Sequence, residues 1–155
     1  MIRSQKTRPF LWFNTEAEEA ANYYVAVFKD SKITNVQRQS SGAVMVVEFN
    51  LAGQDYVALN GGPHFKLNEA FSLMVTAEDQ AEVDHLWAYL TADGGSPSRC
   101  GWLKDRFGLS WQIVPQRFFE LMKGPDKAGS SRVFQAMMGM TKFDIAALER
   151  AYSAA

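Results

Sequence analysis

The sequence predicts an α+β fold: two tandem βαβββ modules forming paired curved sheets around a cavity, followed by C-terminal helices. Two observations lead to this prediction. The order strand, helix and three strands occurs twice along the chain, and each of the two helices carries an apolar stripe at the spacing 0, 3, 4, 7. Such a stripe is the period of a helix that lays one side on a sheet. At 155 residues the chain fits a single domain over 1–155, and a chain of this size buries roughly 70% of its unfolded surface.

The first module is expected over residues 8–60. It opens with the apolar and aromatic run RPFLWF at 8–13, which predicts a strand. Thr15 and Glu18 have the spacing of a capping box, so a helix is expected from about 16 to 28 with Thr15 as its N-cap. The stripe of this helix consists of Ala20, Tyr23, Tyr24 and Val27.

Three strands complete this module. They are expected at 33–39, 43–50 and 55–60, because these segments are rich in β-forming residues. Ser-Ser-Gly at 40–42 and Ala-Gly-Gln at 52–54 separate them and predict two hairpin turns.

The second module is expected over residues 70–115. A strand at 70–75 leads to a helix that Thr76 opens in the way Thr15 opens the first, and strands follow at 98–102 and 109–115. Between these last strands, residues 104–108 predict a hairpin turn in which Gly108 takes a positive φ. The stripe of the second helix consists of Val83, Leu86, Trp87 and Leu90.

A helical extension over residues 116–155 follows. Helices are expected at 116–122, 131–140 and 143–152, the first of them ended by Gly-Pro at 124–125. The extension covers apolar surface either on its own module or on a partner chain, and the sequence leaves both arrangements open. Met137, Met138 and Met140 fit ordinary core packing or binding of a partner protein.

Composition restricts the partners. A net charge of −1, with 16 Lys and Arg against 17 Asp and Glu spread along the chain, gives no basic footprint for nucleic acid or an anionic membrane. A single Cys excludes an internal disulfide framework, and the N-terminal residues lack the apolar core of a signal peptide. No apolar run approaches the roughly 20 residues that span a bilayer. We therefore expect a cytoplasmic protein with a small-molecule partner.

Four runs of sequence carry a family resemblance. They are PFLWFNTEAEEAANYYVAVFKDSKI, ALNGGPHFKLNEAFSLMV, CGWLKDRFGLSWQIVP and RVFQAMMGMTKFDIAALERAY, spread over residues 9–152. In this order they resemble the PhnB-like branch of the vicinal oxygen chelate superfamily, which includes glyoxalases and bleomycin-resistance proteins. Many members are called 3-demethylubiquinone-9 3-methyltransferase. The resemblance implies a cavity between paired sheets and a homodimer.

The resemblance also implies positions for metal ligands. Metal-using relatives place His, Gln and Glu on the first and last strand of each module. Here those positions fall at Leu11 or Trp12, Val57 or Leu59, Ser72 and Gln112. Only Gln112 is a good oxygen donor, and so weak a set does not compensate for desolvating a dication. We therefore expect neither a metal nor another cofactor.

The remaining candidates are residues that a bound molecule would contact. Pockets are mostly apolar with a few placed polar groups, which the aromatics Trp12 and Trp102 and the polar Asn60, Ser72 and Gln112 can supply. Gln112 alternates with apolar neighbours, so it faces either the cavity or the outside of its strand. His64 lies in the link between the modules, where loop residues often carry function.

Other conspicuous residues have simpler explanations. Cys100 lacks a nearby base in sequence and is expected to be a small, partly buried residue. His85 is expected on the surface of the second helix, and Gly61-Gly62 leads into a strand rather than a phosphate-binding helix, which favours a flexible linker.

Three hypotheses for function remain. The favoured one is a metal-free protein that binds a small apolar or aromatic molecule. The others are a metal-dependent lyase, isomerase or dioxygenase of the same superfamily, and an interaction role for the C-terminal helices. A methyltransferase is disfavoured, since the early strand-to-helix turn FNTEA at 13–17 lacks the glycines that usually hold a nucleotide-like donor.

Overall fold

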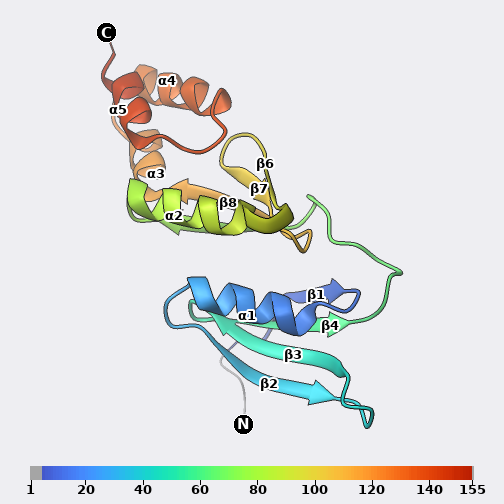
Figure 1. The fold of residues 1–155 in the computed structure, drawn as a ribbon. Coiled ribbons are helices and arrows are strands. Elements are labelled where there is room, and N and C mark those ends of the chain that lie inside the picture. Colours follow the sequence, from blue (N-terminus) through green and yellow to red (C-terminus); the bar gives the residue numbers. More distant parts are fainter. Residues whose placement is uncertain (1–4, 155) are drawn as a thin grey trace. The chain divides into compact units, whose positions relative to one another are not determined.

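The computed structural model describes residues 5–154. The chain divides into two compact units, one ending at Leu67 and the other beginning at Asn68. Each unit contains a four-stranded mixed sheet with a helix on it, and the C-terminal helices belong to the second unit (Figure 1). The predicted α+β class, with two βαβββ modules in tandem and a helical extension, is confirmed.

The first unit follows the predicted order of elements. These are β1 (Phe10–Phe13), α1 (Ala17–Val27), β2 (Lys32–Arg38), β3 (Val44–Leu51) and β4 (Gln54–Asn60). The sheet order is β1-β4-β3-β2, in which β1 runs parallel to β4 and the other pairs are antiparallel. Helix α1 packs on this sheet. It buries four small or aromatic side chains there: Ala17, Ala20, Ala21 and Tyr24.

The N-terminus of α1 differs from the prediction. Its N-cap is Glu16, and no side chain of that residue or of Thr15 caps the helix. Instead, the backbone N–H of Ala17 donates to Oδ1 of Asn60, at 2.8 Å, from the end of β4. The prediction of Thr15 as N-cap is therefore wrong. The side-chain amide oxygen of a residue on a distant strand accepts the hydrogen bond from the first turn of the helix, and a pattern of neighbouring residues cannot reveal such a partner.

The predicted hairpin turns of the first unit are confirmed. Gly42 has φ 88° between β2 and β3. Between β3 and β4, Ala52 has φ 48° and Gly53 has φ 92°, two successive positive values that are typical of the tight type I′ turn. This turn twists in the sense that antiparallel strands require.

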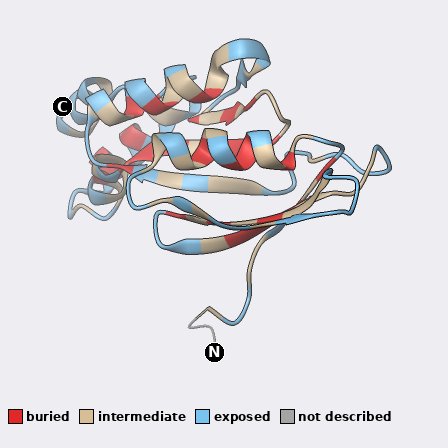
Figure 2. Ribbon diagram, turned by 60° about the horizontal axis from the view of Figure 1, so that its bottom comes forward, coloured by how far each residue is buried: buried red, intermediate tan, exposed pale blue. Residues whose placement is uncertain are grey.

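The second unit repeats the module with shorter strands. Its elements are β5 (Ser72–Ala77), α2 (Gln80–Thr91), a short 3₁₀ turn η1 (Ala92–Gly94), β6 (Ser96–Pro97), β7 (Trp102–Lys104) and β8 (Ser110–Pro115). The order is β5-β8-β7-β6, with β5 parallel to β8. Buried residues, coloured red in Figure 2, fall mainly in helices and strands. Those of α2 are spaced three and four positions apart: Val83, Leu86 and Leu90.

The start of α2 lies three residues later than predicted. Thr76 belongs to β5, and the N-cap is Asp79, whose carboxylate accepts from the N–H of Glu82 at 2.8 Å. In return, the carboxylate of Glu82 accepts from the N–H of Glu78 at 2.6 Å. The prediction of Thr76 as the opening residue is wrong because Asp79 and Glu82 form the stronger capping pair.

A buried aspartate organises the turn between β7 and β8. Asp105 is 2% exposed. One carboxylate oxygen accepts from the N–H of Phe107 (2.8 Å) and of Leu109 (3.1 Å), and the other accepts from the indole N–H of Trp111 (2.9 Å). Gly108 has φ 91°. The predicted hairpin turn at 104–108 is confirmed, with Asp105 as its centre.

The C-terminal extension packs on its own unit. Its helices are α3 (Gln116–Met122), α4 (Lys127–Met138) and α5 (Ile145–Ser153). The loop before α5 accepts two backbone hydrogen bonds from the residues that precede β7. Cys100 N–H donates to Met140 O and Gly101 N–H donates to Thr141 O, both at 2.8 Å. Gln80 of α2 donates to Phe143 O at 2.9 Å and accepts from the N–H of Ile145 at 2.8 Å. Of the two arrangements left open, the structure therefore shows packing within the chain.

No helix within residues 5–154 combines the length and the apolar composition that crossing a membrane requires.

Candidate functional site

The second sheet has one face under α2 and one face opposite it. Trp111 and Ile113 are buried, at 1% and 0% exposure, on the α2 side. Because side chains alternate along a strand, Gln112 points to the opposite face. Of the two orientations left open for Gln112, it takes the one away from the helix.

Strand register arranges this opposite face in two rows. The first row runs Ser72, Ser110, Lys104 across β5, β8 and β7, and the second runs Met74, Gln112, Trp102. We call these six residues the open face of the second sheet. Three predicted residues, Ser72, Trp102 and Gln112, are thus brought together.

Contacts on the open face combine apolar and polar character. Gln112 Nε2 donates to Ser72 Oγ at 3.0 Å, which joins neighbouring strands. Met74 is 56% exposed, while Trp102 is partly buried. Lys104 Nζ forms an ion pair with Glu69, and this hydrogen bond lowers the pKa of the Glu69 carboxyl. The face therefore combines two apolar side chains, Met74 and Trp102, with one amide, two hydroxyls and the ammonium group of Lys104, and Ser110 is the one member that is fully buried.

The first sheet has a comparable face opposite α1. Register aligns Phe10 with Val57 and Trp12 with Leu59 there, while Leu11 lies on the helix side at 2% exposure. Of the alternatives Leu11 and Trp12, the tryptophan is therefore the one on the face opposite the helix.

The start of the linker folds onto Trp12. The indole N–H donates to Gly62 O at 2.9 Å, and Phe65 meets the ring edge-on with centroids 5.0 Å apart. A Cβ on Gly61 would lie 2.4 Å from Cζ2 of Trp12, so only glycine fits against this ring. His64, by contrast, is an exposed residue of the linker.

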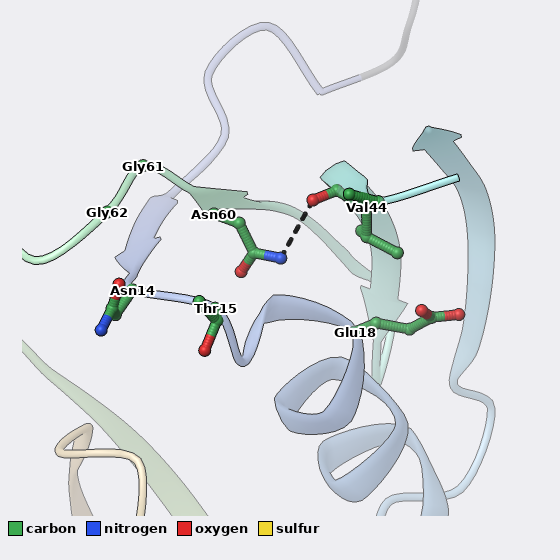
Figure 3. A pocket seen from close by; sticks show the side chains of 8 residues that line it. Asn14, Thr15, Glu18, Val44, Asn60, Gly61 and Gly62 are labelled. Carbon is green, nitrogen blue, oxygen red and sulfur yellow. Dashed lines mark hydrogen bonds between the residues drawn. The ribbon is translucent and has the colours of Figure 1, made fainter. Parts of the chain in front are cut away.

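Asn60 lies beside a pocket of about 520 Å³ at the start of α1 (Figure 3). Its Nδ2 donates to Val44 O at 3.1 Å, and its Oδ1 accepts from Ala17 N–H at 2.8 Å. The side-chain amide of Asn60 thus links the end of β4 to the start of β3 and to the start of α1, which gives Asn60 a positioning role in the first unit. The pocket is lined by Asn14, Thr15, Glu18, Ala43, Val44, Asn60, Gly61 and Gly62.

The other conspicuous residues lie as follows. His85 is exposed on α2, 6.3 Å from the ring of Tyr89, as expected. Cys100 is partly buried with φ 57°, and its thiol lies 3.8 Å from Met138 O. Cys100 is thus a small, partly buried residue, as expected.

Comparison with known proteins identifies the family. The profile of the family described as 3-demethylubiquinone-9 3-methyltransferase matches residues 5–114. A PhnB protein from Bacillus cereus with the same methyltransferase description is 31% identical over 72% of this chain and 99% of its own, with a TM-score of 0.67. This chain belongs to that family. The family lies within the vicinal oxygen chelate superfamily, as the four runs of sequence indicated.

More distant structures share the fold with this member of the 3-demethylubiquinone-9 3-methyltransferase family. A protein from Pseudomonas aeruginosa is 19% identical over 72% of this chain and 98% of its own, with a TM-score of 0.60. A protein from S. aureus is 17% identical over 74% of this chain and 95% of its own, with a TM-score of 0.50. No curated protein matches the chain.

The metal chemistry of the superfamily does not fit the side chains at the four expected positions. Trp12 offers only an N–H donor, Val57 and Leu59 are hydrocarbons, and Ser72 and Gln112 are neutral and bonded to each other. Divalent ions in proteins are usually held by imidazole, carboxylate or thiolate groups, and none of these stands at the four positions. Among residues 5–154, moreover, no three His, Cys, Asp or Glu side chains are grouped to hold a metal.

Sequence reasoning missed three members of the open face: Met74, Ser110 and Lys104. They lie two residues from Ser72, Gln112 and Trp102 respectively, so they share a face with them. This period of two was a usable signal. It was not sufficient alone, because alternation gives two faces without saying which of them the helix covers.

Proposed function

We propose that this protein binds a small apolar or aromatic molecule on the open face of the second sheet, without a metal ion. The row Met74, Gln112, Trp102 is the observation that supports it. A thioether and an indole offer apolar contact on either side of an amide. That combination is typical of pockets that hold an apolar body and orient it through few polar groups.

The first unit supplies further candidates for contact. Trp12 presents an aromatic ring on the face opposite α1, where Phe65 of the linker meets it edge-on. We propose Trp12, and His64 of the linker, as contacts that the first unit itself offers to a small molecule. Asn60 acts in this proposal by fixing the start of α1.

Ligand binding is tested by thermal shift with a panel of metabolites and aromatic compounds, each with and without divalent metals. A molecule that binds only the folded protein raises its melting temperature by mass action. For any compound that does so, Gln112→Ala is expected to weaken binding about 5- to 10-fold, the equivalent of one net hydrogen bond. Isothermal titration measures the affinity.

Gln116→Ala is the matched control, since Gln116 is an exposed glutamine at the start of α3. It is expected to leave every affinity unchanged. A Gln112→Ala protein that keeps all ligand-induced melting shifts at wild-type size would remove Gln112 from the site.

Metal content is a separate prediction. Protein purified without chelator is expected to carry less than stoichiometric nickel, zinc, iron or manganese, because the four positions expected to hold ligands lack imidazole and carboxylate groups. Elemental analysis by mass spectrometry measures this. Stoichiometric metal that is retained on dialysis would contradict the proposal and favour a metal-dependent enzyme.

A further inference from the structure

Lys104 is the only charged residue of the six that form the open face. It lies on β7 two positions from Trp102, so the two side chains share this face. Two residues along a strand span about 7 Å, and one small molecule can therefore contact both side chains. The open face thus offers a cationic group beside an apolar surface.

The partner of this lysine comes from the segment just before β5. Glu69, three residues before that strand, forms the ion pair with Lys104, and both residues belong to the second unit. The side chains of Lys104 and Glu69 remain 38% and 64% exposed. Ion pairs this exposed contribute little to stability, because water solvates both charges and ordering the two side chains costs entropy. A carboxylate from solution can therefore replace that of Glu69 at low cost.

The apolar residues of the open face favour a carboxylate that carries a hydrocarbon group. Met74 is 56% exposed and Trp102 is partly exposed, so a ring placed on them removes apolar surface from water. A ligand carboxylate with such a ring gains this contact in addition to the charge of Lys104. A cationic ligand, by contrast, would meet a like charge.

We infer that the bound molecule is an apolar or aromatic carboxylate whose charge pairs with Lys104 and displaces Glu69. Its hydrocarbon body then lies on Trp102 and Met74, beside the amide of Gln112. This inference rests on the proposed function and adds the chemical class of the ligand. It makes Lys104 a specificity-determining residue and Glu69 an internal competitor of the ligand.

The test uses three probes of similar shape that differ in charge. Phenylacetate is anionic, phenylacetamide is neutral and phenethylamine is cationic. Dissociation constants are measured by ¹H–¹⁵N NMR titration at about 0.01 M salt, where exposed charges are weakly screened. The variants are Lys104→Gln, Glu69→Gln, Gln112→Ala and, as the matched control, Lys142→Gln. Lys142 is also an exposed lysine in an ion pair, but its partner Asp84 lies on α2, which covers the other face of the sheet.

Wild type and Lys142→Gln are expected to bind phenylacetate about 2-fold more tightly than phenylacetamide, and phenethylamine most weakly. Glu69→Gln is expected to increase the affinity for phenylacetate a further 2- to 5-fold or so, about the contribution of one exposed ion pair, and to leave that for phenylacetamide unchanged. Lys104→Gln is expected to lose the preference for phenylacetate. Wild type is expected to lose it as well at about 1 M salt, where the charges are screened.

The outcomes separate the inference from the proposed function. Equal binding of phenylacetate and phenylacetamide by wild type, with Gln112→Ala weakening both, would overturn the inference alone. A preference that survives in Lys104→Gln, or an affinity for phenylacetate that Glu69→Gln does not raise, would do the same. Failure of all three probes to shift any resonance of the open face would count against the proposed function and, with it, the inference.

Discussion

Replacing Asp105 with alanine is expected to lower the free energy of unfolding by about 3–5 kcal/mol, because three donors lose their buried, charged acceptor. The carboxylate accepts three hydrogen bonds, from the backbone N–H groups of Phe107 and Leu109 and from the indole of Trp111. With alanine at position 105, these three N–H groups lose their acceptor, and each unpaired buried donor destabilises the folded state. Urea unfolding followed by circular dichroism measures the loss.

Asp84→Ala is the control for the chemistry of the side chain. Asp84 is an exposed aspartate whose carboxylate pairs with Lys142 at 2.7 Å, and surface pairs contribute at most about 1 kcal/mol. A loss for Asp105→Ala no larger than for Asp84→Ala would contradict the role assigned to the buried carboxylate.

Asp105→Asn isolates the bond to Trp111. The amide oxygen can still accept from the backbone donors, but its NH₂ group then faces the indole N–H, so two donors meet. An intermediate loss of about 1–3 kcal/mol is expected. Adding Trp111→Phe removes that conflict, and the double mutant is expected to be more stable than the sum of the single losses predicts.

The fold was predictable because its signals are local and occur twice. Both helices follow from their 3.6-residue period, and α3 begins and ends at the predicted residues. The caps show the limit of such signals. Asp79 could have been found from its own neighbours, but the group that caps α1 is Asn60, 43 residues from Ala17. No pattern along the chain connects those two residues.

The candidate site was predictable only in part, for a related reason. Gln112 could be assigned to the face opposite Trp111, yet deciding which face carries the helix required the packing of α2 on Trp111 and Ile113. The docking of the extension also depends on Gln80, which bonds to residues 63 and 65 positions away.

Replacing Gly101 with alanine is the second change with a large expected effect. Gly101 has φ 81°, and an added Cβ would lie 2.5 Å from Cε2 of Phe143 and 2.9 Å from the carbonyl oxygen of Ile113. The positive φ alone costs a non-glycine residue about 1–2 kcal/mol, and overpacking adds about 1–3 kcal/mol. Urea unfolding is expected to show a loss of about 2–5 kcal/mol.

Gly42→Ala separates the two contributions. Gly42 has nearly the same φ, 88°, but nothing within 4 Å of an added Cβ, so it is expected to lose only the conformational part. The excess loss at Gly101 then measures the contacts of residue 101 with Phe143 and with the carbonyl oxygen of Ile113. Phe143 lies in the loop before α5, so its share reports how the C-terminal extension packs on the second unit. Trimming that ring in Gly101→Ala/Phe143→Leu is expected to recover part of the excess. Equal losses for the two glycine variants would contradict packing of Phe143 on residue 101, and with it the docking of the extension at this position.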